Sequence, residues 1–522
     1  MITAAPHRPT AVRVNGGEPQ GGLLPSDTNE GYGNRIVDLL FSGLYDYACD
    51  GTTRAAMLER VDSEDSREFR FVIQPSWTFT DGTPVSASNF VAAWNFGAAG
   101  GNAQRQQSWY RPIEGFAEVA GAARASATMS GLVVEDDRTF AVRLSKPNRD
   151  FLNRLGFTPF KPLPDRFFTV GPAEFGEHPV GNGPYQLAGD EAWQHDVRLE
   201  LVPNLRYPGP DRPSNDGITF VFYRDLELAY QDLLDGRLEV LDCVPDSALS
   251  RYRAELGRRA IEQPVALNKS LGVPYSLDRF AGDEGRLRRS AISMAIDRPE
   301  IISQVFAGTK VPASGFAART LPGFDRNLVG ADALSYQPDR ARELWRRANE
   351  IHPWQGSFTI AFNTDGGHQS WIAMVTEQVS RVLGIEAAGY PLATFKQLRE
   401  HLTSGARTAF RTGWRGDYPS LIGSLEPLFA GDASANDVGY YSLAFEQAVA
   451  QAQRASDEAA ANRWVEQAQL ILLADLPVIP LWDFINAGGL GHGVQAQFKW
   501  NGLPDYQTIR CDAGAGAGHD RS

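Results

Sequence analysis

The segment from Arg411 to Phe429, RTGWRGDYPSLIGSLEPLF, contains residue types that could bind a charged ligand. Glycines flank Trp414, and Asp417 is followed at once by Tyr418 and a proline, which is typical of a loop that presents its side chains. A carboxylate beside aromatic rings attracts an ammonium group, because ion pairing, hydrogen bonding and cation–π attraction all favour it. The alternative is an ordinary turn, with Trp414 and Tyr418 in the core and Asp417 capping a neighbouring helix.

The elements around this segment indicate an α/β protein. Residues 199–244 contain two strand patterns, a helix pattern and a further strand pattern, and such mixing is typical of α/β domains. The segment Thr359 to His368, TIAFNTDGGH, predicts a strand that ends in a glycine-rich loop. Ligand sites of α/β domains lie at such strand ends.

The sequence carries none of the common catalytic motifs. It contains no GxSxG, SxxK, HExxH or Walker pattern, and its eight His are scattered without metal-ligand spacing. We therefore predict no catalytic residue, no cofactor and no metal. Paired carboxylates can meet in space without a local motif, so a secreted hydrolase stays open as an alternative of another class.

Length and charge restrict the possible partners. A chain of 522 residues suggests two or three domains. A formal net charge of -13 argues against a nucleic-acid partner, because phosphate binding needs an excess of Lys and Arg. Most of the 50 basic residues are Arg, so we expect Arg or His to anchor any ligand carboxylate.

The central segment resembles the GW-x-ADY-x-x-P-x-x-x-L loop of the extracellular solute-binding proteins of family 5, the peptide and oligopeptide receptors of ABC importers. Gly416 stands where the family usually has Ala. In peptide-binding members the Asp of this loop holds the ligand's α-amino group, and the Trp lines a side-chain pocket. The resemblance assigns these roles to Asp417 and Trp414.

Other segments extend the resemblance over roughly residues 23–482. WTFTDGTPVSASNFVAAWN resembles the family's F-x-DGTP-x-TAEDV, and PVGNGPYQL resembles VGTGPY. The helical stretch from Arg286 to Gly308 resembles RQALNYAIDR. These segments identify a fold without locating a site.

The resemblance implies further ligand-binding residues. Asn363 and His368 match an N-T-x-x-x-H of oligopeptide receptors, in which the His can meet the ligand's carboxylate. Arg411 matches a basic residue used for ligand carboxylates. Ser42 and Tyr45 lie where the family has a helix followed by a strand near the ligand backbone, with Ser42 in place of the usual Glu.

The implied fold is α/β, a two-lobed periplasmic-binding-protein-like clamp of type II, cluster C, with an extra subdomain in the first lobe. Two crossings between the lobes, near Val265 and near Val478, would form a hinge that closes over the ligand. The expected parts are lobe I at 1–52 and 178–265, the extra subdomain at 53–177, lobe II at 266–480, and a return to lobe I with a disordered tail at 481–522.

The resemblance implies a receptor that captures a short peptide between its lobes and delivers it to an ABC permease driven by ATPase subunits. Relatives that carry oligosaccharides or other small solutes keep those ligands open. We expect a monomer in the extracellular space or cell envelope, lipid-anchored to the outer face of the cytoplasmic membrane.

The chain ends and cysteines leave questions open. ITAAPHRPTAVRV after Met1 has no apolar signal-peptide core. We expect a mature export product whose signal and anchor segment are absent here, although the sequence alone also allows a cytosolic protein. Cys49, Cys243 and Cys511 allow three disulfide pairings, among which the sequence cannot choose.

Overall fold

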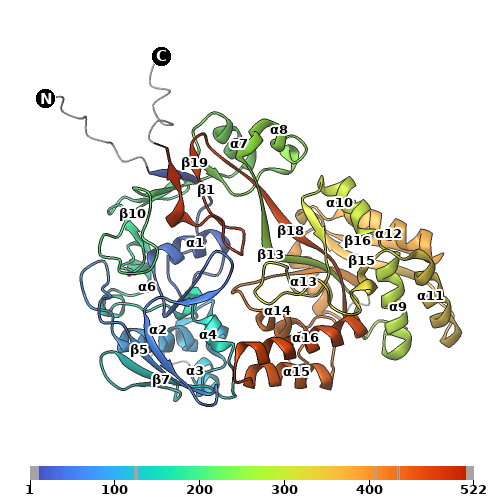
Figure 1. The fold of residues 1–522 in the computed structure, drawn as a ribbon, viewed down its shortest axis with the longest axis horizontal. Helices are drawn as coiled ribbons and strands as arrows, with labels where there is room; N and C mark the ends of the chain where they lie inside the picture. The colour runs from blue at the N-terminus through green and yellow to red at the C-terminus, as the bar shows by residue number, and fades with distance from the viewer. Residues whose placement is uncertain (1–10, 123–126, 406–407, 432, 434, 513–522) are drawn as a thin grey trace. The chain divides into compact units, whose positions relative to one another are not determined.

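The chain forms two compact units in a computed structural model that describes residues 11–122, 127–405, 408–431, 433 and 435–512 (Figure 1). Unit 1 contains the chain up to Ile261, together with Ala487–Lys499 and the chain from Leu503 onward. Unit 2 contains Glu262–Asn486 and Trp500–Gly502. The chain passes between the units within two long strands, β13 (Ala260–Gly272) and β18 (Val478–Leu490).

The passage in β18 differs from the crossing expected near Val478. The sequence pattern LPVIPLW stops at Trp482, whereas the strand continues to Leu490 and leaves unit 2 after Asn486. Its second half, DFINAGGL, lacks the apolar run that marks the first half. The extra subdomain and the predicted boundaries of the parts remain predictions.

Unit 1 is built around a sheet in the order β12-β1-β11-β10-β8, with β9 paired to β10. β1 is parallel to β11, and β11 is antiparallel to β10. A separate sheet has the order β4-β5-β7-β6. The strands are β1 (Val12–Gly16), β2 (Tyr45–Tyr47), β3 (Thr53–Ala55), β4 (Leu58–Asp62), β5 (Glu68–Ile73), β6 (Leu132–Val134), β7 (Thr139–Arg143), β8 (Tyr185–Leu187), β9 (Trp193–Gln194), β10 (Arg198–Pro203), β11 (Ile218–Phe222), β12 (Val240–Leu241), β19 (Val494–Gln495) and β20 (Arg510–Cys511).

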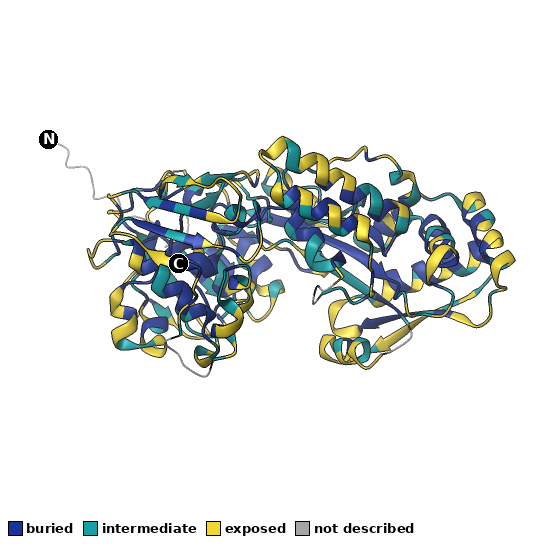
Figure 2. Cartoon of the chain, turned by 90° about the horizontal axis from the view of Figure 1, so that it is seen from below, coloured by how far each residue is buried: buried dark blue, intermediate teal, exposed yellow. Residues whose placement is uncertain are grey.

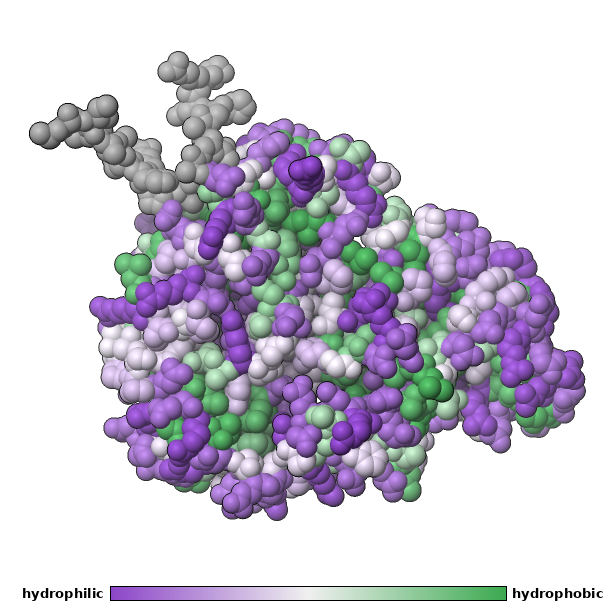
Figure 3. All heavy atoms as spheres, in the orientation of Figure 1, coloured by the Kyte–Doolittle hydropathy of each residue, from purple (hydrophilic) through white to green (hydrophobic). Residues whose placement is uncertain are grey.

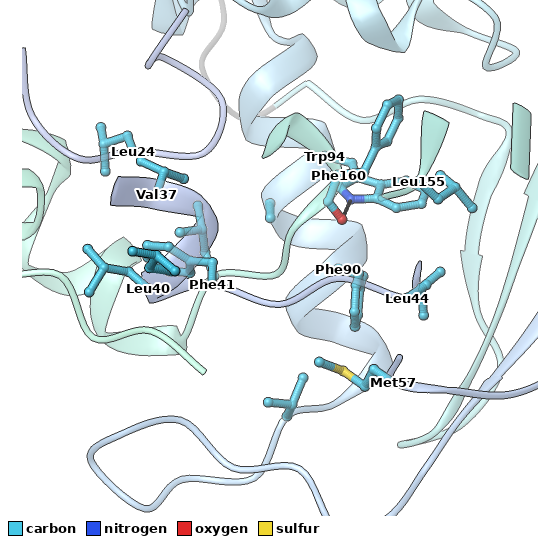
Figure 4. Close-up of a cluster of buried hydrophobic side chains, with 14 of the residues drawn as sticks. Leu24, Val37, Leu40, Phe41, Leu44, Met57, Phe90, Trp94, Leu155 and Phe160 are labelled. Atoms are coloured by element: carbon cyan, nitrogen blue, oxygen red, sulfur yellow. Dashed lines mark hydrogen bonds between the residues drawn. The ribbon is translucent and has the colours of Figure 1, made fainter. Parts of the chain in front are cut away.

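The helices of unit 1 pack on these sheets through aromatic and aliphatic side chains. Figure 4 shows this core, where Trp94 Nε1 donates to the carbonyl oxygen of Phe160 at 3.0 Å. Figure 2 shows the buried strands in dark blue. The helices are α1 (Gly31–Leu40), α2 (Ala87–Ala98), α3 (Phe116–Ala120), α4 (Phe151–Arg154), α5 (Asp165–Val170), α6 (Pro172–Glu177), α7 (Leu226–Leu234) and α8 (Tyr252–Leu256).

Unit 2 has a mixed sheet in the order β16-β15-β17-β13-β18, with β14 paired to β18. β15 is parallel to both β16 and β17, whereas β17 is antiparallel to β13. The parallel part indicates α/β packing, in which helices cover the sheet. The strands besides β13 and β18 are β14 (Lys310–Pro312), β15 (Ser357–Asn363), β16 (Glu386–Leu392) and β17 (Ala409–Arg415).

The helices of unit 2 are amphipathic. In α11 the buried residues recur at helical spacing, Ala341, Leu344, Trp345 and Ala348, and the remaining face is charged. The surface over α9 and α11 is accordingly mostly hydrophilic in Figure 3. The helices are α9 (Gly282–Ala295), α10 (Arg298–Phe306), α11 (Pro338–Ile351), α12 (Gln369–Leu383), α13 (Phe395–Thr403), α14 (Leu421–Phe429), α15 (Leu443–Arg454) and α16 (Glu458–Asp475).

Several chain features complete the fold. No helix in the described part of the chain is long and apolar enough to cross a membrane. All three cysteines are free thiols, so the structure contains none of the three possible disulfides. The tail expected to be disordered, beyond residue 512, lies outside the described residues.

A buried polar cluster joins three elements of unit 1. The Asp242 carboxylate follows β12, accepts from Arg35 of α1 at 2.8 Å and accepts from the Asn15 amide of β1 at 2.7 Å. Asp242 is only 7 % exposed. The carboxylate thus neutralises a cation inside the unit, and the pKa of Arg35 is raised because Tyr506 and Asp242 offset the cost of its burial.

We predict that Asp242→Ala strongly destabilises unit 1. Removing one partner of a buried ion pair leaves the other charge uncompensated, which costs about 3–5 kcal/mol. Scanning calorimetry, which separates the unfolding of two units, would measure the loss. Asp62→Ala, in the exposed pair Arg60–Asp62, is the control and should change stability by less than about 0.5 kcal/mol. Equal effects of the two variants would contradict the prediction.

Candidate functional site

The centre of the candidate site lies on two neighbouring strands of unit 2, β13 and β17. Leu271 lies opposite Arg411 across the pair, and Lys269 lies opposite Gly413. Side chains alternate between the two faces of a strand, and residues directly opposite share a face. Arg411 and Lys269 therefore project from the same face of the sheet as diagonal neighbours.

Asn363, at the end of β15, holds Arg411 in place. Its Oδ1 accepts from Arg411 Nε at 2.6 Å and from a terminal guanidinium nitrogen, while its own amide donates to Asp365. The guanidinium also lies over the Phe395 ring, 4.8 Å from its centre. Asn363 is 3 % exposed. The structure thus gives this predicted ligand-binding residue a positioning role, because its polar atoms are already bonded.

His368 lies beside Arg411, at the residue preceding α12. Its Nδ1 accepts from Trp371 Nε1 at 3.2 Å, so the proton of the neutral ring is on Nε2. Burial, followed by the charges of Lys269 and Arg411, lowers the pKa of His368 to about 3. The imidazole is therefore a neutral donor at physiological pH.

Two lysines complete this cluster. Lys269 is 9 % exposed, and burial, followed by the charges of Arg411 and Lys310, lowers its pKa to about 8. The ammonium of Lys310, on β14, lies 4.3 Å from the centre of the Phe484 ring, and that of Lys269 lies 5.8 Å from the same centre. We call Lys269, Lys310, His368 and Arg411 the basic group.

Lys269 and Arg411 have little opposing charge in the part of the chain that the structure describes. Among the described residues Lys269 makes no hydrogen bond or ion pair, and Arg411 makes no ion pair. Asp365 is the acidic residue that acts on Arg411 and His368, and its pKa is lowered chiefly by the hydrogen bond from Asn363. Partly buried cations without counter-charge can bind an anion favourably.

Asp417 lies in the turn between β17 and α14. Its carboxylate reaches solvent, yet the surrounding protein restricts its hydration and raises its pKa to about 6, against the opposing effect of Arg415. It has no hydrogen-bond or ion-pair partner among the residues that the structure describes. The alternative of a capping Asp is wrong for α14, because Ser420 caps that helix by accepting from Gly423 N at 3.0 Å.

Trp414 lies on the opposite face of β17 from Arg411. Its backbone N donates to the Asn268 side chain at 3.1 Å, which holds the end of the strand. The indole is half-buried, and its Nε1 is a buried donor without a partner in the described structure. Leaving such a donor unpaired costs about 1–3 kcal/mol, so it favours a ligand or water acceptor.

Tyr418 does not line an accessible surface. The side chain is 4 % exposed, and its ring lies so close to Gly423 that a side chain there would collide with it. The predicted role of Tyr418 as an aromatic wall of the site is therefore not supported, because the ring is part of the core of unit 2. For Tyr418 the structure agrees with the alternative interpretation of the segment, an ordinary turn whose aromatic ring lies in the core.

Ser42 and Tyr45 belong to unit 1. The backbone N and O of Ser42 are both bonded to the side-chain amide of Asn182, at 3.0 and 3.1 Å. Tyr45, in β2, is half-buried, and burial raises its pKa to about 12. The contacts of Ser42 are structural, and ligand binding by either residue remains a prediction.

Lys269 and Lys310 are site candidates that sequence reasoning missed. The scarcity of Lys led us to expect Arg or His as the carboxylate anchor. Neither lysine lies in a segment that resembles a family motif, so the sequence offered no local signal for them. The pairing of the two strands, which puts Lys269 opposite Gly413, is visible only in the tertiary structure.

Comparison with known proteins agrees with the sequence resemblance. Residues 52–436 match the model of the family "Bacterial extracellular solute-binding proteins, family 5 Middle". The oligopeptide-binding protein OppA of Bacillus subtilis (strain 168) is 23% identical over 493 residues, covering 91% of this chain and 88% of that protein. The glutathione-binding protein GsiB of Escherichia coli O6:K15:H31 (strain 536 / UPEC) is 22% identical, covering 88% and 86%.

Solved structures show the same fold. The unliganded open form of MppA, a periplasmic murein tripeptide-binding protein, has a TM-score of 0.83 at 21% identity, covering 96% of this chain and 97% of that one. The OppA structure from Burkholderia pseudomallei has a TM-score of 0.73 at 20% identity, covering 97% and 99%. The prediction of a mixed α/β fold of the cluster C binding proteins is confirmed.

The basic group predicts an unusual lysine titration. In protein labelled with ¹³C at the lysine side chains, the Lys269 resonance should titrate with a midpoint near pH 8, because its pKa is lowered to about 8. Arg411→Gln should raise that midpoint, since it removes a like charge. Lys269→Gln assigns the resonance, and Lys396, 86% exposed, is the internal reference. A Lys269 midpoint equal to the reference would contradict the prediction.

Proposed function

Because the chain belongs to the bacterial extracellular solute-binding proteins of family 5, we propose that it captures a short peptide for an ABC importer. The peptide would be delivered to a membrane permease driven by ATPase subunits. Family members are transport binding proteins and not enzymes, which removes the hydrolase alternative.

The observation that carries this proposal is that Asp417 and Lys269, two opposite charges in unit 2, have no hydrogen-bond or ion-pair partner among the described residues. Asp417 offers a carboxylate of raised pKa to an ammonium group. The basic group offers buried cations to a carboxylate. A peptide with free termini carries both complementary charges, whereas a neutral oligosaccharide carries neither.

The spacing of these charges suits a short ligand. Asp417 lies six residues beyond Arg411, and an extended chain of that length spans at most about 20 Å. An extended peptide that reaches from one charge to the other would therefore have at most about six residues.

Relatives differ in ligand, and the two charges suit each of the ligands that their names give. The curated relatives include dipeptide-, oligopeptide- and glutathione-binding proteins. All three ligand types carry an amino group and a carboxylate, so each would satisfy both charges.

We propose that this chain works as a monomer at the outer face of the cytoplasmic membrane, held there by a lipid anchor.

We predict that free peptides stabilise the protein and that terminally blocked peptides at the same concentration stabilise it less. A tetrapeptide of Ala or Gly at a hundredfold its dissociation constant should raise stability by about 2.7 kcal/mol, measured by thermal unfolding. N-acetylation removes the charge that Asp417 would bind, and C-amidation removes the charge that Arg411 would bind. Each should weaken binding by about ten- to hundredfold.

Mass spectrometry of the same mixtures tests for cleavage. Intact peptide after prolonged incubation is the expected result. Cleavage products, or stabilisation by sugars with none by any peptide, would overturn the proposed function. Equal affinity for free and blocked peptides would overturn the assignment of the two charges while leaving peptide binding in place.

The raised pKa of Asp417 predicts that affinity falls at acid pH. An ammonium ligand stabilises the carboxylate, so the pKa in the complex lies below the value of about 6 in the free protein. The ligand then binds fully above pH 6 and must displace a proton below it. Calorimetry should show about tenfold weaker binding at pH 5 than at pH 7.

Asp417→Asn should weaken binding at pH 7 by about ten- to hundredfold and remove most of the pH dependence. This variant also separates Asp417 from Asp483, whose pKa burial raises to about 6 and which stays unchanged. The control is Asp278→Asn, at a carboxylate that is 85% exposed. A wild-type pH profile in Asp417→Asn would show that Asp417 does not contact the ammonium.

A further inference from the structure

We propose that the basic group selects peptides whose carboxyl-terminal residue is Asp or Glu, so that two carboxylates enter it together. This inference rests on the proposed function and adds the ligand class. It assigns Lys269 as a specificity-determining residue, which no motif of the sequence singles out.

Lys269 and Arg411 together carry more positive charge than one terminal carboxylate can match. Lys269, Lys310 and Arg411 are cations, whereas His368 is neutral, as its bond from Trp371 requires. Asp365 opposes Arg411 and is bonded to Asn363 and to the backbone N of Phe395. One terminal carboxylate has a single charge, which Arg411 can match through its planar fork. The charge of Lys269 remains, because Lys269 has no hydrogen-bond or ion-pair partner among the described residues.

Lys269 is buried without a bonding partner. Only 9 % of the residue is exposed, and its ammonium has three donors without an acceptor in the described structure. Other buried cations of unit 2 are satisfied. Arg298, at 1 % exposed, donates to the carbonyl oxygen of Pro480 at 2.8 and 2.9 Å and to that of Ser293 at 3.0 Å. Lys269 therefore differs from a structural cation.

The two lysines lie near each other. The ammonium of Lys269 is 5.8 Å and that of Lys310 is 4.3 Å from the centre of the Phe484 ring, so the two nitrogens are at most about 10 Å apart. Lys269 also shares a sheet face with Arg411. The two carboxylates of a terminal Glu are joined by few bonds, so one can meet Arg411 while the other meets a lysine.

The test compares three tetrapeptides that differ only in their last residue, Glu, Gln or Lys, by calorimetry at pH 7. We expect the Glu peptide to bind about ten- to hundredfold more tightly than the Gln peptide, and the Lys peptide to bind most weakly. In Lys269→Gln the ratio of the Glu and Gln affinities should fall toward one. Lys396→Gln, at an exposed lysine, is the matched control and should keep the wild-type ratio.

A second readout separates charge from shape. The preference for Glu should decline between pH 7 and pH 9, because Lys269 loses its proton in that range, and Lys269→Arg should keep the preference at pH 9. If Lys269→Gln does not fold, Lys310→Gln tests the same ratio. Equal binding of the Glu and Gln peptides would overturn this inference and leave the proposed function standing. Binding of none of the three peptides would overturn both.

Discussion

Lys269 and Gly413 lie opposite each other across β13 and β17, and the site of unit 2 depends on this pairing. A shift of one residue would turn Lys269 to the other face of the sheet and separate it from Arg411. The absence of a side chain at Gly413 permits this close pairing, because a Cβ there would collide with the carbonyl oxygen of Asn268. The pairing also fixes the end of β17, where Asn268 bonds the backbone of Trp414 and the chain turns to present Asp417.

The charges of the site are destabilising to the free protein. Burial raises the pKa of Asp417 and lowers the pKa of Lys269, so in both residues the surroundings disfavour the charged form. By contrast, Asp242 in unit 1 and Arg298 in unit 2 are buried ions whose charges are bonded. Asp417 and Lys269 have no such partner among the described residues, and a ligand of opposite charge would relieve the cost.

The supporting residues show how such a site stays rigid without a ligand. Asn363 binds Arg411 through one oxygen and Asp365 through its amide, so the guanidinium keeps one orientation. The Phe395 and Phe484 rings lie beside the cations and attract them through their π faces. A site held by such contacts loses less conformational entropy when it binds.

Local sequence determined the fold class and the identity of several charged candidates. Motifs such as DGTP and the turn around Asp417 are short and continuous, so their residues are read without knowledge of distant contacts. Tertiary structure alone decided that Tyr418 is buried, that Asn363 positions Arg411, and that Lys269 and Lys310 join the basic group. The reason is physical: burial and strand register depend on residues far apart in the chain, and a lysine in a strand has the same local sequence whether it faces solvent or a buried Arg.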